Sequence, residues 1–340
     1  MKDARGREIK YLRVSVTDRC NLRCKYCMPN GIECVEHKDI LSFEEIRQIA
    51  VCGARLGITK IRLTGGEPLA RKGCPELIRM LKEIPGIEKI AMTTNGTLVR
   101  AILPELVEAG LDEINISLDT LDPGTFAAIT GQDLLPEVLL AIDAALAAGL
   151  KVKVNAVSMP DTDWKRLITL AKDKPVDVRF IELMPIGEGR HSEGRSNEDL
   201  LEKIRSEFPQ LQADDSVHGA GPAVYYKIPG YQGSIGLISA MHGKFCSSCN
   251  RVRLTSTGFL KTCLCYEDGT DLREILRGER DVSDHAEGDR IGMVQSGAAG
   301  AENKELIDAM ARTIYGKPAE HCFEQPDQIT EAHGMSAIGG

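Results

Sequence analysis

Three cysteines near the N-terminus, Cys20, Cys24 and Cys27, have the spacing of metal ligands. They directly follow the first predicted strand, and short irregular loops of this kind hold iron–sulfur clusters through converging thiolates. A zinc ion is the alternative, but structural zinc takes four ligands, commonly from two Cys-x₂-Cys pairs. A set of three thiols therefore favours a [4Fe–4S] cluster with one iron left open for a substrate.

A second group of three cysteines lies far along the chain, at Cys246, Cys249 and Cys263. We favour a second [4Fe–4S] cluster here, again with three protein ligands and an open iron. Cys265 is a candidate fourth ligand, and with it the site would be a structural zinc or a closed cluster. The sequence alone leaves this alternative open.

Two arginines, Arg251 and Arg253, follow the second cysteine group at alternate positions of a predicted strand. Alternate residues of a strand project to the same face. A pair of guanidinium groups beside a metal site suits a phosphate chain, because each can form bidentate hydrogen bonds to phosphate oxygens. A solvated basic strand is the alternative for an isolated pair, but the position between Cys249 and Cys263 favours phosphate binding.

Composition narrows the class of protein. Eleven cysteines occur among 340 residues without an apolar leader at the start of the chain, so metal binding or catalysis is favoured over disulfides. The formal net charge of -8 argues against sequence-independent binding to nucleic acid. Apolar runs of about 18 residues, which a membrane helix needs, are missing from the sequence. We expect a cytoplasmic protein that binds neither membranes nor nucleic acid.

The elements that must position these residues alternate between strands and helices up to about residue 207. Predicted strands are Leu12–Thr17, Lys60–Thr64, Lys89–Thr94, Glu113–Asp119, Lys151–Val157 and Asp177–Leu183. Predicted helices are Phe43–Leu56, Pro75–Glu83, Pro104–Ala109, Pro136–Ala148 and Thr162–Lys172, the first with a capping box at Ser42 and Glu45. Six strand–helix alternations predict a parallel sheet in an incomplete (β/α)₆ barrel of the TIM type.

The helical pattern fades after about residue 210. Short strands are predicted at Val224–Lys227, Gly236–Ser239 and Val252–Thr255, a loop at 278–303 and a helix at Asn303–Tyr315. We therefore divide the chain into a barrel domain at residues 1–210 and a smaller C-terminal region at 211–340. The smaller region contains β-strands, the second cysteine group and a flexible Gly-Gly end.

The motifs around both cysteine groups resemble one enzyme family. Cys-x₃-Cys-x₂-Cys followed by Gly65-Gly66-Glu67-Pro68 is similar to the radical S-adenosylmethionine (SAM) superfamily. The chain further resembles the GTP 3′,8-cyclases of molybdenum-cofactor biosynthesis, over about residues 8–277 and the last two glycines. The segments that carry this resemblance are YLRVSVTDRCNLRCKYCMP, IRLTGGEPL, MTTNG, SLD, VKVN, RFIELM and FCSSCNRVRLT.

The resemblance implies a role for each matching residue. Cluster ligands would be Cys20, Cys24, Cys27, Cys246, Cys249 and Cys263. SAM would contact Tyr26, Gly66, Ser117 and Met184. GTP would contact Arg13, Arg62, Thr93, Lys153, Arg251, Val252 and Arg253, with Arg179 as a weaker candidate. Arg13, Gly339 and Gly340 would act in catalysis.

The resemblance also implies a reaction and its partners. A 5′-deoxyadenosyl radical made from SAM would take hydrogen from ribose C3′ of GTP, and C3′ would then bond to guanine C8. The cofactors would be two [4Fe–4S] clusters and SAM, with a flavodoxin- or ferredoxin-type electron donor. The product would pass to cyclic pyranopterin monophosphate synthase, and a homodimer is left open. A peptide-modifying radical SAM enzyme and a non-catalytic iron–sulfur or zinc scaffold are the alternatives.

Overall fold

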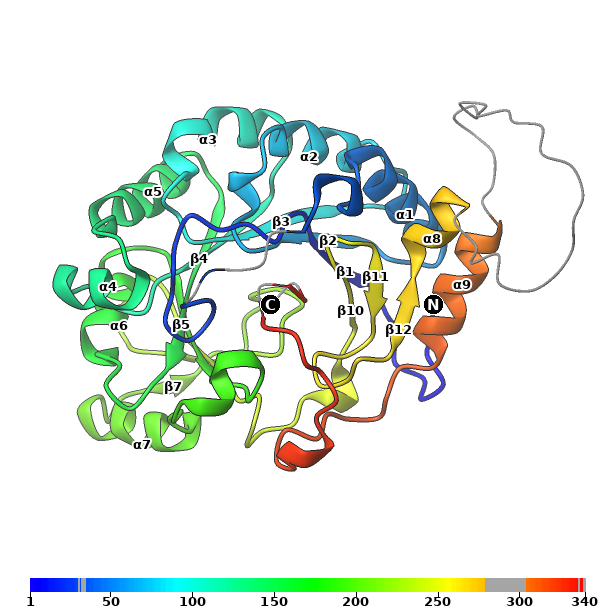
Figure 1. The fold of residues 1–340 in the computed structure, drawn as a ribbon. Helices are drawn as coiled ribbons and strands as arrows, with labels where there is room; N and C mark the ends of the chain where they lie inside the picture. The colour runs from blue at the N-terminus through cyan, green and yellow to red at the C-terminus, as the bar shows by residue number, and fades with distance from the viewer. Residues whose placement is uncertain (30, 32–34, 279–303, 336, 339–340) are drawn as a thin grey trace, which may run out of the picture.

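Six parallel strands form the centre of the fold within the described residues, and helices cover the outer face of the sheet (Figure 1). The computed structural model describes residues 1–29, 31, 35–278, 304–335 and 337–338. The central strands are β1 (Tyr11–Ser15), β2 (Lys60–Thr64), β3 (Lys89–Thr94), β4 (Glu113–Ser117), β5 (Lys151–Ser158) and β6 (Asp177–Glu182). The helices between and after them are α1 (Phe43–Arg55), α2 (Cys74–Lys82), α3 (Val99–Glu108), α4 (Pro123–Thr130), α5 (Leu135–Ala147), α6 (Trp164–Asp173) and α7 (Asn197–Glu207).

The described residues of the C-terminal part add short strands and two α-helices. They are β7 (Gln212–Ala213), β8 (Val224–Lys227), β9 (Ile235–Ile238), β10 (Arg251–Leu254), β11 (Phe259–Lys261), β12 (Gly269–Asp271), α8 (Leu272–Arg277) and α9 (Lys304–Tyr315). Single 3₁₀ turns are η1 (His37–Asp39), η2 (Pro68–Ala70), η3 (Gly187–His191), η4 (Cys246–Ser248) and η5 (Pro326–Gln328). The predicted loop at 278–303 lies almost entirely outside the described residues.

Strands from the C-terminal region extend both edges of the central sheet. β10 pairs in parallel with β1, with Leu12 opposite Val252, and β9 pairs in parallel with β6, with Phe180 opposite Leu237. Within the described residues the sheet therefore runs β12-β11-β10-β1-β2-β3-β4-β5-β6-β9-β8-β7. The predicted class, an incomplete α/β barrel with a β-containing C-terminal region, is confirmed. The division at residue 210 stays a prediction, and one continuous sheet crosses it.

Each strand of the barrel has one face toward the helices and one toward the interior. On β1, Leu12 and Val14 are fully buried in the hydrophobic core, while Tyr11 and Arg13 alternate with them and line a central cavity. Because side chains alternate across a strand, the same sequence supplies both a packed outer layer and a polar interior. The polar interior is where the predicted chemical residues lie.

Local signals explain most helix boundaries. Ser42 Oγ accepts a hydrogen bond from Glu45 N at 3.1 Å, and Glu45 Oε2 accepts from Ser42 N at 2.7 Å, so the predicted capping box of α1 is confirmed. The predicted start of α3 at Pro104 is wrong, because the helix begins at Val99 and contains the proline. α4 and α7 were not predicted. α4 nevertheless has Asp122 as N-cap and proline at its first position, which is a readable signal.

Within the described residues no single helix has both the length and the apolarity that a membrane span requires. α4 and α5 meet them only as a pair bent by 101°.

Candidate active site

A cavity of about 380 Å³ opens inside the barrel. Apart from Val252, every predicted site residue that the structure describes lines it. Val252 is fully buried and lies between Arg251 and Arg253 on β10, so its side chain points to the opposite face of that strand. The GTP contact expected of Val252 is one of its backbone, and it stays a prediction. Gly339 and Gly340 lie outside the described residues. Two neighbours in sequence are described: Met335 lines the cavity and Ile338 is buried.

The first cysteine group lies on the loop after β1. The main-chain N–H groups of Cys27 and Met28 both donate to Cys24 O at 2.9 Å, which turns the loop tightly. Burial, together with nearby Asp119, Cys27 and Cys20, raises the pKa of the Cys24 thiol to about 12. Three half-buried thiols that repel one another as thiolates fit a cationic iron–sulfur cluster, which binds them deprotonated.

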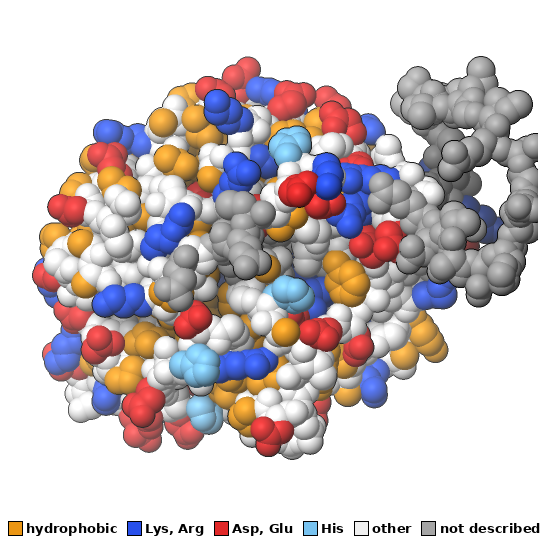
Figure 2. Space-filling model, in the orientation of Figure 1, with side chains coloured by type: hydrophobic (Ala, Val, Ile, Leu, Met, Phe, Trp, Pro, Cys, Tyr) orange, Lys and Arg blue, Asp and Glu red, His pale blue; other side chains and the backbone are white. Residues whose placement is uncertain are grey.

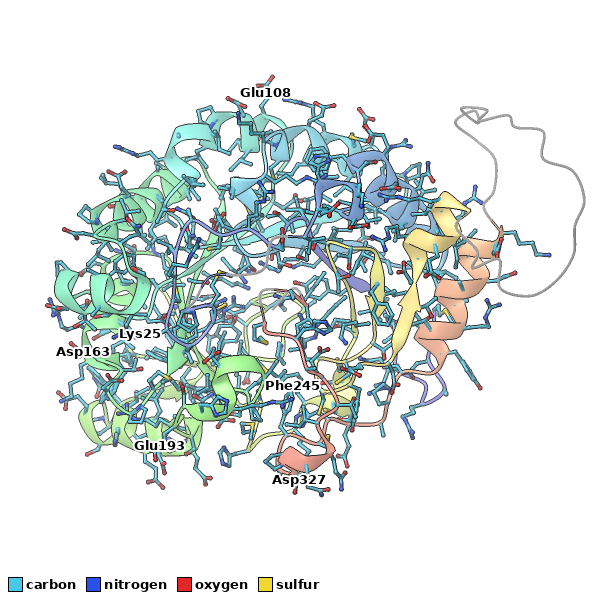
Figure 3. The ribbon with its side chains drawn as sticks, viewed as in Figure 1. Lys25, Glu108, Asp163, Glu193, Phe245 and Asp327 are labelled. Carbon is cyan, nitrogen blue, oxygen red and sulfur yellow. The ribbon has the colours of Figure 1, made fainter. Side chains whose placement is uncertain are left out.

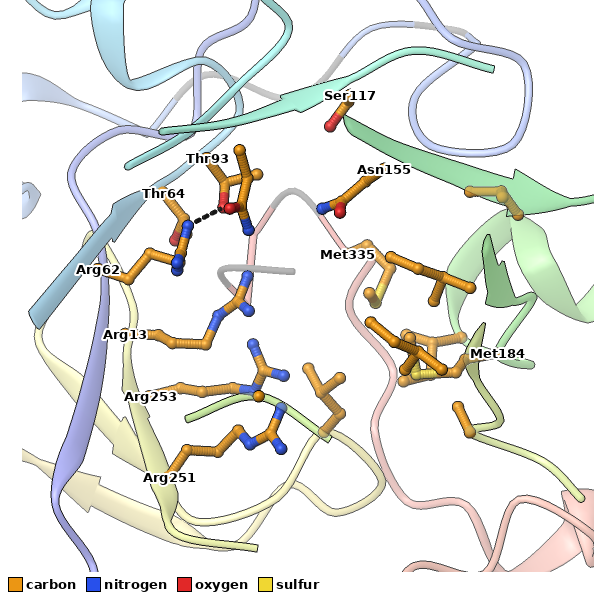
Figure 4. A pocket seen from close by; sticks show the side chains of 18 of the residues that line it. Arg13, Arg62, Thr64, Thr93, Ser117, Asn155, Met184, Arg251, Arg253 and Met335 are labelled. Atoms are coloured by element: carbon orange, nitrogen blue, oxygen red, sulfur yellow. Dashed lines mark hydrogen bonds between the residues drawn. The ribbon is translucent and has the colours of Figure 1, made fainter. Parts of the chain in front are cut away.

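Tyr26 fastens this loop to the neighbouring strands. Its hydroxyl donates to Asp119 Oδ2 at 2.5 Å, and Asp119 Oδ1 accepts from Val157 N at 2.8 Å. Ser117 at the end of β4 lies on the same side, and Met184 lies across the cavity from the arginines (Figure 4). The four residues predicted to contact SAM therefore share one cavity with the first cysteine group.

The Gly-Gly-Glu-Pro motif packs against the backbone just before Cys20. A Cβ added at Gly66 would lie 2.4 Å from Arg19 O, and one at Gly65 would lie 2.5 Å from Thr17 O. Glu67 is fully buried, and it accepts hydrogen bonds from Thr94 Oγ1 and from Asn95 N at 2.7 Å each. Burial raises the pKa of Glu67 to about 7. The glycines are thus required for a close approach of two chain segments.

The second cysteine group lies in a more cationic environment. Burial by itself would raise the pKa of the Cys249 thiol, but Lys317, Arg251 and Arg253 outweigh it and lower the pKa. Burial raises the pKa of Cys246, and Cys263 and Cys249 raise it further. Mutually repelling thiols beside fixed cations again fit a cluster held by three thiolates.

Cys265 does not line the cavity, whereas Cys263 does. The sulfur of Cys265 lies 3.0 Å from the sulfur of Cys322, and Cys322 N donates a hydrogen bond to the Cys265 sulfur at 3.2 Å. Cys265 is fully buried in a small apolar cluster with Phe323 and Ile329. Cys265 thus packs against Cys322, whereas Cys263, which borders the same apolar cluster, lines the cavity.

Four arginines extend side by side into the cavity from three adjacent strands (Figure 4). Arg253 is paired in register with Arg13, and Arg13 with Arg62, so these three lie at one level, with Arg251 next to them. We call these four residues the arginine cluster. Burial lowers the pKa of Arg13 well below its usual value, and Arg253 adds to this effect. Like charges this close repel one another, and an anion bound between them would offset that repulsion.

The positive field also acts on a neighbouring tyrosine. Burial would raise the pKa of Tyr11, but Arg62, Arg13 and Lys60 together lower it to about 8. Arg62 is partly occupied by the protein itself, because its Nε donates to Tyr11 OH at 2.5 Å and its Nη1 to Thr93 Oγ1 at 3.3 Å. Arg62 therefore lines the cavity with part of its guanidinium already hydrogen-bonded to the protein.

Two further charged residues, Lys60 and Glu113, line the cavity beside the predicted Lys153, and sequence reasoning missed both. Glu113 lies 2.7 Å from Lys60 Nζ and 3.5 Å from Arg62 Nη2, and these cations lower its pKa to about 2 despite its burial. Lys153 donates to His218 O, and burial followed by the charge of Arg179 lowers the Lys153 pKa to about 7. The alternation of strand residues was the readable signal, because Lys60 and Glu113 occupy inward positions of β2 and β4.

Charge is distributed differently outside the cavity. On the face in Figure 2, acidic and basic side chains are interspersed over the surface. Figure 3 places Phe245 toward the middle of the molecule, whereas Glu108, Asp163 and Glu193 lie at the periphery. The Phe245 ring centroid is 5.2 Å from the guanidinium carbon of Arg251, so an aromatic side chain borders the arginine cluster near the second cysteine group.

The fold and the site together define the class of protein. Residues 14–173 match the family model of the radical SAM superfamily, and residues 176–295 match the model named Molybdenum Cofactor Synthesis C. The chain is 42% identical over 344 residues to a GTP 3′,8-cyclase of Clostridium perfringens (strain 13 / Type A), covering 100% of both. It is 46% identical over 349 residues to the GTP 3′,8-cyclase of Heliobacterium modesticaldum, again covering 100% of both. The chain belongs to the GTP 3′,8-cyclase family of radical SAM enzymes.

Solved structures support the fold. Streptococcus suis SuiB bound to S-adenosylmethionine matches with a TM-score of 0.61 at 14% sequence identity, over 81% of this chain and 64% of that chain. A second structure of SuiB matches with a TM-score of 0.56 at 16% identity, over 76% of this chain and 61% of that chain. The chain thus spans less than two thirds of SuiB. The likeness establishes a shared barrel architecture.

Proposed function

We propose that this chain converts GTP to (8S)-3′,8-cyclo-7,8-dihydroguanosine 5′-triphosphate, an early step of molybdenum-cofactor biosynthesis. One observation carries the proposal: the arginine cluster lies in the same cavity as both groups of three cysteines. On this proposal, the first cysteine group serves SAM cleavage, the second binds the guanine base and the arginine cluster binds the phosphates. Full-length relatives named GTP 3′,8-cyclase support the same conclusion.

Two [4Fe–4S] clusters fit the donor sets, with Cys20, Cys24 and Cys27 as ligands of one cluster. Cys246, Cys249 and Cys263 are proposed as ligands of the other. When bound and reduced, the first cluster supplies the electron that splits SAM into methionine and the 5′-deoxyadenosyl radical. The burial of Cys265 against Cys322 supports a second site with three thiolates rather than four.

The protein's own residues bind and orient the two substrates. Gly66, Tyr26, Ser117 and Met184 line the cavity and are proposed to contact SAM. Arg13, Arg251 and Arg253 would hold the triphosphate through charge-assisted hydrogen bonds. The barrel walls surround both substrates, and exclusion of water protects a radical from side reactions.

Lys153, Arg62 and Thr93 complete the proposed GTP site from the neighbouring strands. Arg13 and the terminal residues Gly339 and Gly340 are proposed to act close to the reacting ribose. The electron donor, the downstream cyclic pyranopterin monophosphate synthase, a homodimer and a cytoplasmic location remain predictions. A peptide-modifying activity is the second candidate, but a row of arginines lining one cavity suits a triphosphate better than a peptide.

The two cysteine groups give the test, because they are proposed to have different tasks. Cys24→Ser removes one thiolate of the first cluster, and SAM cleavage to 5′-deoxyadenosine should stop. Cys263→Ser should leave that cleavage intact while GTP binding is lost. Normal amounts of cyclised GTP from Cys263→Ser would show that the second group is no substrate site.

A further inference from the structure

A buried arginine near the N-terminus, Arg7, joins the second cysteine group to the C-terminal segment of the chain. Its Nη1 donates to the carbonyl oxygens of Cys246 and Ala319, both at 2.9 Å. Its Nη2 donates to Pro318 O at 2.6 Å and to Lys317 O at 3.2 Å. The Arg7 side chain is only 7% exposed, so its N–H groups have little access to water as an alternative partner.

Asp3 fixes the orientation of this guanidinium group. Arg7 Nε donates to Asp3 Oδ2 at 2.6 Å, and Asp3 Oδ1 accepts from the main-chain N–H groups of Arg5 and Arg7 at 2.9 Å each. All five N–H groups of the Arg7 side chain therefore have an acceptor. Only arginine presents five donors in a planar fork, and lysine at this position would leave carbonyl oxygens unpaired.

The segment that Arg7 binds includes Lys317, whose ammonium group lies near the other two cysteines of the second group. Lys317 is 4% exposed, and its ammonium group donates to Thr262 O, one residue before Cys263. The positive charge of Lys317 also lowers the pKa of the Cys249 thiol. Arg7 thus contacts the peptide of Cys246 directly, and it reaches Cys249 and Cys263 through Lys317.

The neighbouring backbone holds the N-terminal segment against both of these parts of the chain. Ala4 N donates to Tyr315 O at 3.1 Å, at the end of α9, and Lys10 N donates to Asn250 O at 3.1 Å, one residue after Cys249. The two bonds flank Arg7 in the sequence. The chain segment that carries Arg7 is therefore fixed on both sides of this residue, and Asp3 fixes the side chain itself.

We propose that Arg7, oriented by Asp3, is a positioning residue for the second cluster. It fixes the loop of Cys246 and the segment of Lys317 relative to each other, so that three sulfurs converge with a cation beside Cys249. The inference rests on the proposed function of the second cysteine group as a cluster site. Arg7 contacts neither substrate nor reacting atoms, and its effect passes through Cys246 and Lys317.

The test is Arg7→Lys, which keeps the charge and loses the fork. After anaerobic reconstitution, the iron content should fall from about eight to about four per chain, while SAM cleavage by the first cluster continues. The matched control is Arg5→Lys, because Arg5 lies two residues away with an exposed side chain, and this variant should keep about eight irons.

A second measurement isolates the second cluster by its spectrum. In a chain with Cys20, Cys24 and Cys27 all changed to serine, only the second cluster remains. Adding Arg7→Lys there should abolish its electron paramagnetic resonance signal or change the signal's line shape. Two clusters with an unchanged spectrum would overturn the inference, and so would loss of both clusters, because Arg7 would then support the whole fold. An unmodified chain with about four irons would instead overturn the proposed second cluster itself.

Discussion

At the scale of single residues, the arginine cluster gives the sharpest expectation. Arg253 is 8% exposed and lies in register with Arg13, so Arg253→Ala removes one cation from the proposed phosphate site. A lost charge-assisted hydrogen bond costs roughly 1.5–3 kcal/mol, so GTP affinity should fall about ten- to a hundredfold. Calorimetric titration with GTP measures this, and iron content should stay unchanged. The control is Arg100→Ala on α3, whose side chain is 54% exposed and which should bind GTP normally.

Lys153 should make GTP binding depend on pH. Its pKa is lowered to about 7 by burial and by Arg179, so the side chain loses its proton above neutral pH in the absence of a ligand. A triphosphate favours the protonated form, so binding takes up a proton, and affinity should fall as pH rises above about 7, by at most about tenfold per pH unit. Lys153→Arg, which stays charged, should flatten this dependence. An equal pH dependence in both proteins would contradict the role given to Lys153.

The site residues that could be predicted from the sequence belong to short motifs, and those that were missed do not. The cysteines, Arg251 and Arg253 belong to short motifs whose spacing is readable by itself. Lys60 and Glu113 belong to no such motif, and only the pairing of β1 through β4 brings them to one side of the barrel. Strand alternation predicts that both point inward, but it does not predict which inward residues approach each other.

At the scale of elements, we expect the contact between the β2–η2 turn and the loop of Cys20 to determine whether the first cluster can form. Gly66→Ala would place a Cβ 2.4 Å from Arg19 O, and one of the two backbones must then shift. We expect loss of the first cluster and of SAM cleavage, measured as about four irons per chain and no 5′-deoxyadenosine. Gly124→Ala in α4 is the control, because its added Cβ meets Asp122 at an ordinary 3.4 Å. Full iron content in Gly66→Ala would show that the close approach is not required.

The sequence predicted the barrel strands better than the way its edges are completed. The runs that became β1 to β6 have strong β-branched patterns, and their order follows from right-handed crossovers. The short strands β9 and β10 were also predicted. The pairing of β9 with β6 and of β10 with β1 was not predicted, because a four-residue strand does not indicate its partner. For β10 that partner lies more than two hundred residues earlier in the chain. Long-range pairing of this kind depends on the whole core.

At the scale of the whole molecule, the C-terminal segment returns to the barrel interior. Met335 lines the cavity and Ile338 is buried, although Gly339 and Gly340 lie outside the described residues. Deletion of the two glycines should keep both clusters and near-normal GTP affinity. The ratio of cyclised GTP to 5′-deoxyadenosine should fall by about an order of magnitude or more, or ~1.4 kcal/mol of barrier. An unchanged ratio and rate in a single anaerobic assay would remove the tail from the mechanism.

We propose that SAM cleavage and the binding of a guanine nucleotide take place in the same cavity. The most direct measurement incubates the reduced, reconstituted chain with SAM and, separately, GTP, ATP, CTP and UTP, and quantifies 5′-deoxyadenosine and any cyclised nucleotide. We predict that GTP alone yields 3′,8-cyclised product, with 5′-deoxyadenosine formed in proportion to it. Cyclisation of another nucleotide, or 5′-deoxyadenosine that forms with GTP present and no cyclised product, would contradict the account.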